Sequence, residues 1–315
     1  MIYVITINFN QSRMTIECVN SVLKSDYDDF KIYIIDNGSE LSDCTKLYDE
    51  FQDSPHVRIL RTEKNLGYAG GVNYGLKQAF NAGADYFLIM NNDTIIDKNA
   101  MKELVDASKR RDDHAIISGK VYHYNSPDVI QYAGSFYLDK NILNVVSPFQ
   151  NEKDVGQCEV EREMDMLDDI FWLLPKNIYQ SVGLYPDCYF LYAEQADYAL
   201  QAVKKGFKLI FTPKAKLWHI GSLSSGNGNC YAPTANFWRQ KSRIIYLYRN
   251  LKLHHFIIIS IKISIKVVLK FLLSYLKIRD IENYGTHYSA LLGLLYGFKW
   301  IIHQKPDDGY NPFID

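Results

Sequence analysis

The chain has 315 residues, of which 47% are hydrophobic, so it can bury the core of a large α/β domain or of a domain with an appendage. Its five cysteines are scattered without a CxxC spacing, which argues against a disulfide framework or a zinc site. The formal net charge is −1, yet residues 198–279 contain 15 Lys and Arg and no Asp or Glu, whereas the rest contains 20 basic and 36 acidic residues. This asymmetry predicts a negatively charged partner such as a nucleotide phosphate or an anionic membrane surface, or else a solvated basic face. We expect no nucleic-acid partner, because no binding motif accompanies the basic residues.

The N-terminal half alternates between predicted strands and helices. The first residues lack the basic start of a secretory signal, so we expect a cytoplasmic protein. Strands separated by helices indicate a mostly parallel sheet, whose ligands bind beyond the carboxyl ends of the strands. The predicted elements are strand 2–8, helix 13–24, strand 31–36, strand 56–62, helix 71–82 and strand 85–93.

The C-terminal half is harder to interpret. Residues 120–170 are irregular, and helices are predicted at 171–180 and 194–206. A further strand is expected at 207–213, and the chain beyond residue 233 is helical, aromatic and basic.

A glycine-rich segment, NLGYAGGVNYGL at 65–76, lies between a predicted strand and a predicted helix. It is not a GxGxxG motif, so a dinucleotide-binding fold is poorly supported. Glycines at such a turn let backbone N–H groups approach a phosphate at the helix N-terminus. A purely structural tight turn is the alternative.

The segment MNND at 90–93 places amides and one carboxylate at the end of a buried strand. A carboxylate there can bind Mg²⁺ or Mn²⁺, ions that usually share their coordination shell with substrate phosphates. The alternative is an N-cap for the helix that follows. Next to a glycine-rich phosphate turn, the metal site is the favoured interpretation.

Glu194 and Asp197 lie three residues apart and share one face of a predicted helix. A carboxylate at the start of a helix beside a ligand pocket can act as a general base. Alternatively, both acids complement the helix dipole. His219, which follows a strand and a Trp, is either a ligand or a structural residue.

The order of six segments resembles the family 2 glycosyltransferases with a GT-A fold, in particular bacterial rhamnosyltransferases of surface-polysaccharide assembly. The resemblance covers about residues 1–250 and rests on ITINFN, IIDNGSE, NLGYAGGVNYGL, LIMNNDT, FLYAEQADYALQAVKKG and WHIGS. It implies a mostly parallel Rossmann-like sheet flanked by helices. The expected domains are a catalytic domain at 1–235, with a nucleotide-sugar half at 1–97 and an acceptor half at 98–235, and a helical region at 236–315.

The resemblance also implies the roles of individual residues. Asp36 matches the residue that contacts the nucleobase, and Asp93 of the NND segment matches the metal-binding carboxylate of a DxD motif. His219 matches a histidine that completes the metal or diphosphate site, with Mn²⁺ or Mg²⁺ as cofactor. The implied donor-nucleotide residues are Thr6, Asn8, Asn10, Asp36, Asn65, Gly70, Gly71, Asn73, Asn91 and Asn92.

Two departures from the family pattern concern charge. The DxD position has Asn91 in place of its first carboxylate. The usual EDxD motif is EQAD here, so its customary base is replaced by Gln195, which cannot accept a proton near neutral pH. Glu194 is the favoured base; the alternatives are that Asp197 is the base or that activity is impaired.

Residues 256–276 have the length of a membrane span, but three lysines disfavour insertion. Lys262, Lys266 and Lys270 recur every four residues, with Lys277 on the same side, and another side carries Ile257, Ile261, Ile265, Val268, Leu272 and Leu276. Such a basic amphipathic helix would lie on an anionic membrane surface. Packing on the catalytic domain or a homodimer interface is the alternative.

The sequence therefore predicts an inverting, metal-dependent glycosyltransferase at the inner face of the cell membrane. The expected donor is a dTDP- or UDP-sugar, with rhamnose or a similar sugar transferred to a saccharide acceptor that is lipid-linked. A sugar nucleotidyltransferase and a non-catalytic nucleotide-sugar-binding protein are the alternatives.

Overall fold

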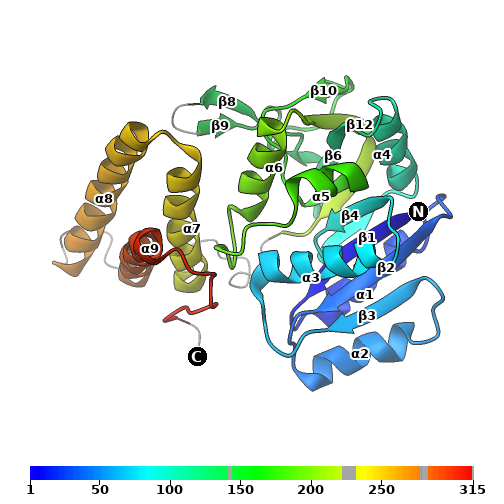
Figure 1. The fold of residues 1–315 in the computed structure, drawn as a ribbon, viewed down its shortest axis with the longest axis horizontal. Helices are drawn as coiled ribbons and strands as arrows, with labels where there is room; N and C mark the ends of the chain where they lie inside the picture. The colour runs from blue at the N-terminus through cyan, green and yellow to red at the C-terminus, as the bar shows by residue number, and fades with distance from the viewer. Residues whose placement is uncertain (141–143, 222–231, 277, 279–282, 314–315) are drawn as a thin grey trace. The chain divides into compact units, whose positions relative to one another are not determined.

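The computed structural model describes residues 1–313 except 141–143, 222–231, 277 and 279–282 (Figure 1). The chain forms two compact units, each built from several segments. Unit 1 comprises Met1–Tyr137, Val145–Tyr185 and Tyr198–Gly221, and unit 2 comprises Leu138–Asn144, Pro186–Asp197 and Ser222–Asp315.

The N-terminal half of unit 1 alternates strands and helices, as predicted. Its elements are β1 (Ile2–Asn8), α1 (Ser12–Val22), β2 (Phe30–Asp36), α2 (Leu41–Phe51), β3 (Val57–Arg61), α3 (Gly67–Asn81), β4 (Tyr86–Met90), β5 (Thr94–Ile96) and α4 (Ala100–Lys109). The elements that follow are β6 (Ala115–His123), β7 (Ser126–Tyr132), β8 (Phe136–Asp139), β9 (Asn144–Val146), β10 (Arg162–Glu163), β11 (Phe171–Pro175), α5 (Lys176–Val182), α6 (Glu194–Lys204) and β12 (Lys208–His219).

The central sheet has the strand order β10-β12-β6-β11-β4-β1-β2-β3, and β5 and β7 pair with β12 and β6 at its side. The pairs β1–β2, β1–β4, β2–β3 and β6–β12 are parallel. Strand β11 enters antiparallel between β4 and β6. The predicted α/β fold with a mostly parallel sheet is therefore confirmed, with antiparallel strands added in its second half.

Helices cover both faces of this sheet because alternate side chains of each strand point to opposite faces. Even-numbered residues of β1, such as Ile2 and Val4, pack in one core with Cys18, Val19 and Leu47 of α1 and α2. On the other face, a Cβ atom added to Gly75 of α3 would lie only 2.5 Å from a methyl group of Ile5, so glycine lets α3 approach β1 closely. This layered arrangement leaves the carboxyl ends of β1, β2 and β4 at one edge of the sheet.

The helix predicted at 171–180 is wrong in its first half. Residues Phe171–Pro175 form the fully buried strand β11, and only Lys176–Val182 are helical. A short apolar run has no periodicity that separates a buried strand from a buried helix. The predicted strand at 207–213 is in fact longer, because β12 continues to His219.

Unit 2 contains α7 (Pro233–Asn250), α8 (Leu253–Tyr275) and α9 (Tyr284–His303), which confirm the predicted helical C-terminal extension. Glycines bring α7 and α9 together. A Cβ atom added to Gly293 would lie 2.3 Å from the carbonyl oxygen of Phe237, and one added to Gly297 would lie 2.8 Å from Cβ of Ile244. The two helix backbones therefore touch where neither residue has a side chain.

Helix α8 contacts both α7 and α9 within unit 2. Among the described residues, no helix combines the length and the apolar character that crossing a membrane requires. Lys277, which the sequence places beside the other lysines of this segment, lies outside the described residues.

Candidate active site

Strands β1 and β2 end side by side, because the parallel register pairs Asn8 with Asp36. Asn8 is fully buried, and its Nδ2 lies 3.1 Å from Asp36 Oδ1 and 3.0 Å from both Ser39 Oγ and Asp43 Oδ2. Thr6 is also buried, two residues before Asn8 and on the same face of β1. The first predicted nucleotide residues therefore form one buried polar cluster at the sheet edge.

Asp36 is the centre of this cluster. Its carboxylate is fully buried and pairs with the guanidinium of Arg61, with 2.9 Å between Nη1 and Oδ2. Arg61 also donates to the backbone carbonyl of Ser39 at 2.6 Å. A buried carboxylate that keeps its charge requires such a partner. Its predicted contact with a nucleobase remains a prediction.

Asn10 lies in the turn after β1 with a left-handed backbone, at a φ of 54°. Its side-chain oxygen accepts a hydrogen bond from the N–H of Glu40 at 2.8 Å, and its own N–H donates to Ser39 Oγ at 3.0 Å. Asparagine tolerates this backbone region better than most residues. Asn10 therefore links the turn after β1 to the turn after β2.

Asn37 fixes the segment that carries Asn65. Its Nδ2 donates to Asn65 Oδ1 at 3.0 Å and to the carbonyl of Gly67 at 2.9 Å, and its Oδ1 accepts from the N–H of Leu66 at 3.0 Å. Gly38 completes this contact, because a Cβ atom there would lie 2.4 Å from the backbone of Lys64. The turns after β2 and β3 are thus joined by hydrogen bonds and close packing.

The glycines predicted to form a strand-to-helix turn lie inside a helix, which corrects that expectation. Helix α3 begins at Gly67, so Gly70 and Gly71 belong to its first turns. A Cβ atom on Gly71 would lie 3.2 Å from Ile7 of β1, which explains this glycine by helix–sheet packing. Only the N–H groups of the first helical turn are placed to face an anion.

Asn73 is held by the backbone of Tyr185 in both directions. Its Nδ2 donates to the Tyr185 carbonyl and its Oδ1 accepts from the Tyr185 N–H, both at 2.9 Å. This pairing gives Asn73 a structural part in fixing the loop before α6. Its predicted contact with a donor nucleotide remains a prediction.

The NND segment does not cap a helix. Asp93 is followed directly by β5, and α4 begins only at Ala100, after an N-cap at Asn99. The capping interpretation of MNND is therefore wrong. Asn92 is buried, and its Nδ2 donates to Thr15 Oγ1 at 2.9 Å, which ties the segment to α1.

Asp93 and His219 are brought together by strand pairing. The antiparallel register of β5 and β12 places His219 opposite Thr94, and the N–H of Ile220 donates to the carbonyl of Asp93 at 3.0 Å. As a result, His219 Nε2 lies 3.2 Å from Asp93 Oδ1, although the two residues are far apart in sequence. Both side chains are almost fully buried.

The histidine ring is oriented by two amides. Its Nδ1 lies 2.7 Å from Gln131 Oε1, and Asn91 Nδ2 lies 3.4 Å from Nε2. With Gln131 Oε1 as acceptor, Nδ1 is the ring nitrogen that donates, and Nε2 is the nitrogen that faces Asp93. Such an outer hydrogen bond on the second ring nitrogen is typical of metal-binding histidines.

Asp93 and His219 fit a divalent cation that also binds phosphate. Two neighbouring ligands on an octahedral ion, each at about 2.1 Å, are about 3 Å apart, close to the separation of these two atoms. In the part of the chain that the structure describes, no group of three or more His, Cys, Asp or Glu side chains could hold a metal. The protein thus offers two ligands, and an ion here would need further oxygens from water or substrate.

Asp169, which the sequence analysis missed, is buried just before β11. Its Oδ2 accepts a hydrogen bond from Tyr185 Oη at 2.9 Å, and the carbonyl of the next residue, Ile170, accepts from the N–H of Asn91 at 3.0 Å. Burial, together with the charge of Asp168, raises the pKa of Asp169 to about 7. Tyr68 of α3 hydrogen-bonds Asn91 Oδ1 at 3.4 Å and also interacts with Asp169. A buried, readily protonated carboxyl therefore lies next to the NND segment.

The two predicted bases lie in unit 2, at the start of α6. Glu194 and Asp197 are both buried in the first turn of the helix. Asp197 Oδ2 accepts from Tyr189 Oη at 2.8 Å and from Arg249 Nε at 2.5 Å. Asp197 Oδ2 is therefore engaged by two donors, one of them a guanidinium.

The backbone just before Glu194 adopts an uncommon conformation. Tyr192 and Ala193 both have a φ of 69°, in the left-handed region that favours glycine. Each such residue costs on the order of 1 kcal/mol or more, and strain of this kind is concentrated at functional sites. The strained pair fixes the direction in which the chain enters α6 and so the place of Glu194.

Gln195 also has an unusual environment for an amide. Its Oε1 is buried and has no hydrogen-bond partner among the described residues. A buried acceptor without a donor is rare, and it needs a water molecule or a ligand group to satisfy it. A sugar hydroxyl is a donor of the right kind.

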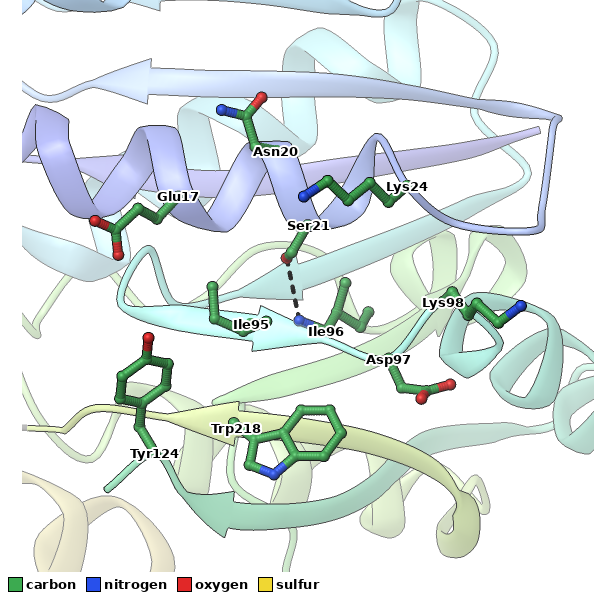
Figure 2. Close-up of a pocket in the computed structure, with 10 residues that line it drawn as sticks. All are labelled: Glu17, Asn20, Ser21, Lys24, Ile95, Ile96, Asp97, Lys98, Tyr124 and Trp218. Atoms are coloured by element: carbon green, nitrogen blue, oxygen red, sulfur yellow. Dashed lines mark hydrogen bonds between the residues drawn. The ribbon is translucent and has the colours of Figure 1, made fainter. Parts of the chain in front are cut away.

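A pocket of about 760 Å³ lies between α1 and the β5–β12 pair, away from the residues predicted for the site (Figure 2). Figure 2 shows Trp218 and Tyr124 on one side and Glu17 and Lys24 of α1 on the other. Trp218 and His219 are neighbours on a strand, so they point to opposite faces. This pocket and the Asp93–His219 pair therefore lie on different faces of β12.

Several residues that contact the predicted site residues have no signal in the sequence. Gln131 lies in the irregular middle of the chain, and Arg249 is 52 residues from the carboxylate that it binds. Asp169 precedes an apolar run that also matched a helix. The sequence signal that could have identified Asp169 is the pair Asp168–Asp169 directly before the apolar run that forms β11.

The comparisons with known proteins identify the family and the fold. The model of the family described as "Glycosyl transferase family 2" matches residues 3–171. GlyG, a glycosyltransferase of Streptococcus pneumoniae, is 30% identical over 44% of this chain and 43% of its own length. An N-acetylglucosaminyl-diphospho-decaprenol L-rhamnosyltransferase of Mycobacterium tuberculosis is 26% identical over 62% of this chain and 68% of its own length. The chain spans less than half the length of the first curated relatives that it matches.

Solved structures support the fold. The crystal structure of GalNAc-T7 with UDP, GalNAc and Mn²⁺ has a TM-score of 0.62 at 17% identity, over 79% of this chain and 47% of that one. Residues 1–349 of TarS from Staphylococcus aureus give a TM-score of 0.51 at 15% identity, over 81% of this chain and 68% of that one. The fold is the GT-A fold that the sequence predicted. Since the family model covers more than half of the chain, the protein belongs to glycosyl transferase family 2.

Proposed function

We propose that this protein is an inverting, metal-dependent glycosyltransferase that moves rhamnose or a similar sugar from a dTDP- or UDP-sugar to a saccharide acceptor. The observation that carries the proposal is the Asp93–His219 pair, 3.2 Å apart, with Gln131 behind the imidazole. Family membership supports the reaction class. The name of the mycobacterial relative supports rhamnose and a lipid-linked acceptor.

On the donor side, residues of unit 1 hold the nucleotide and its diphosphate. The buried cluster of Asn8 and Asp36 would bind the nucleoside, and the N-terminus of α3 would face the phosphates. Asp93 and His219 would hold Mn²⁺ or Mg²⁺. Such an ion supplies charge stabilisation for the departing nucleoside diphosphate.

On the acceptor side, Glu194 would accept the proton of the attacking hydroxyl. Asp197 is committed to Arg249 and Tyr189, so it is better suited to position α6 than to take a proton. Gln195 Oε1 would accept a hydrogen bond from a sugar hydroxyl and so help to orient the acceptor. In this proposal, the replacement of the family's usual acid by Gln195 changes a base into a positioning residue.

We place this reaction at the inner face of the cell membrane, with the protein bound peripherally. The basic C-terminal third and the decaprenol in the relative's name support this localisation. A lipid-linked acceptor stays at the bilayer surface, so an enzyme that uses it must work there.

Calorimetry with dTDP- and UDP-sugars tests the donor site. We expect one donor to bind in the presence of Mn²⁺ or Mg²⁺ and to lose its affinity when a chelator is added. Turnover that releases a nucleoside diphosphate supports the transferase, whereas release of pyrophosphate would identify a nucleotidyltransferase. Metal-dependent binding without any turnover, with acceptors offered, would identify a non-catalytic binding protein.

A further inference from the structure

Helix α8 has two apolar faces, and unit 2 covers only one of them. Phe256, Ile263 and Val267 are buried in the core that α8 shares with α7 and α9. A second set of large apolar side chains is 38–55% exposed. We call this set the exposed strip: Ile258, Ile261, Ile265, Val268, Leu269 and Leu272.

The exposed strip lies on the side of α8 opposite to its buried face. At about 100° of rotation per residue, the strip occupies an arc of about 100°, roughly half a turn from Phe256 and Val267. Over residues 258–272 it extends for about 21 Å along the helix. Monomeric proteins rarely expose a contiguous apolar surface of this length, which marks it as an interaction site.

A row of exposed lysines runs along one edge of the strip. Lys262, Lys266 and Lys270 follow at intervals of four residues, between the exposed strip and the buried face. Their long side chains can extend toward charged groups at the level of the strip while their methylene chains cover its edge. The surface therefore combines an apolar centre with a positive margin.

This combination fits an anionic lipid surface better than a second copy of the chain. Helices α7, α8 and α9 contain no Asp or Glu, so the helices of another copy would offer no carboxylate to the lysine row. Anionic lipid headgroups attract lysines at the surface, and their acyl boundary accepts the apolar strip. We infer that the exposed strip and the lysine row of α8 form the surface with which this protein binds an anionic membrane. The inference deepens the proposed function by naming its membrane-binding surface.

Flotation of the full chain with lipid vesicles tests this inference. We expect binding to phosphatidylcholine vesicles that contain about a third of phosphatidylglycerol, and weaker binding as salt rises. The triple change Lys262→Glu, Lys266→Glu and Lys270→Glu should reduce partitioning by at least about a hundred-fold, because each lysine near the surface contributes roughly fivefold and the change also reverses the charge. The double change Ile261→Asp and Ile265→Asp should abolish binding.

Matched controls use exposed residues of unit 1. Lys46→Glu, Lys77→Glu and Lys109→Glu make the same change in net charge, and Leu41→Asp makes a similar apolar-to-acid change. These variants should bind vesicles as the unchanged chain does, apart from a small uniform effect of net charge. Equal losses in the control and α8 variants would overturn the inference.

Two further outcomes would also overturn it. The unchanged chain could fail to bind the vesicles that contain phosphatidylglycerol. Alternatively, sedimentation could show a dimer that Ile261→Asp and Ile265→Asp dissociate, which would assign the strip to a second copy. Calorimetry with dTDP-rhamnose and Mn²⁺ on the same variants separates this inference from the proposed function. Lost vesicle binding with intact donor binding concerns α8 alone, whereas absent donor binding in every variant concerns the active site.

Discussion

Two buried carboxylates, Asp93 in unit 1 and Asp197 in unit 2, differ in the basic group that faces them. Asp93 faces the imidazole of His219 at 3.2 Å, whereas Asp197 is bound by the guanidinium of Arg249 at 2.5 Å. An imidazole can be neutral and share a cation, but a guanidinium is always charged and pairs with the carboxylate directly. Burial alone therefore does not identify a reacting carboxylate, because the chemistry of its partner decides what it can do.

The change Glu194→Gln asks whether Glu194, and not the paired Asp197, is the base on the acceptor side. It should have the largest effect on transfer. We expect transfer to fall by about a thousand-fold, because the variant removes the group that accepts the hydroxyl proton. Donor affinity, measured by calorimetry, should stay unchanged. If Asp197→Asn instead abolished transfer at normal stability while Glu194→Gln did not, Asp197 would be the base and the comparison would be reversed.

The change Asp93→Asn tests the donor side. We expect a loss of transfer of several hundred-fold, because an amide no longer offers the charge that holds the cation against the diphosphate. Donor titrations with and without Mn²⁺ should become identical. Asp97→Asn, four residues further along the chain, is the matched control and should keep the Mn²⁺ dependence of donor binding. Tight donor binding by Asp93→Asn that still requires Mn²⁺ would contradict the role of Asp93 as a metal ligand.

The change Arg249→Met asks whether Asp197 depends on its guanidinium for stability. Removing the cation leaves a fully buried carboxylate without its charge partner, so we expect the free energy of unfolding in urea to fall by about 3 kcal/mol. The double variant Arg249→Met with Asp197→Asn should recover part of the lost free energy of unfolding, because it no longer buries an unpaired charge. Lys102→Met, which breaks an exposed ion pair with Asp106, should cost less than about 1 kcal/mol; an equal cost at both sites would show that the pair has no special role.

Asp169 offers a smaller, pH-dependent test. Its pKa in the folded chain is raised to about 7, so between about pH 4 and pH 7 the folded state holds a proton that the unfolded state has lost. The stability that this proton binding gives to the folded state is fully present below about pH 4. It is lost as the pH rises through 7, and the free energy of unfolding falls by up to about 1.4 kcal/mol per pH unit. Asp169→Asn should remove this slope in urea unfolding and be relatively more stable at pH 8. Parallel stability curves for the two proteins would show that Asp169 does not titrate in this range.

The strand ends could be predicted from the sequence because each carries its polar residues directly after an apolar run. Asn8, Asp36 and Asp93 all lie where the pattern placed them, and the helices around them were mostly found. The pairing of Asp93 with His219 followed from the resemblance, and its geometry depends on the register of β5 and β12, which no local pattern reveals.

What could not be predicted depends on contacts between distant segments. Strand β11 inserts antiparallel between β4 and β6, and its apolar run FWLLP gave no sign of that direction. Gln131 and Arg249 act through partners far along the chain. The sequence predicted an apolar side of α8 that includes Ile261 and Ile265, and these residues are exposed. Only the packed structure reveals that unit 2 buries a different apolar face of α8, with Phe256, Ile263 and Val267.

The close contact of α7 and α9 limits how this chain can be shortened. Gly293 and Gly297 of α9 let the two helices meet backbone to backbone, so α9 covers part of α7 closely. A fragment that ends before Tyr284 would expose the buried residues Phe237 and Ile244 of α7 to water. Truncation before α9 should therefore yield a protein that aggregates, and the three C-terminal helices are best kept together.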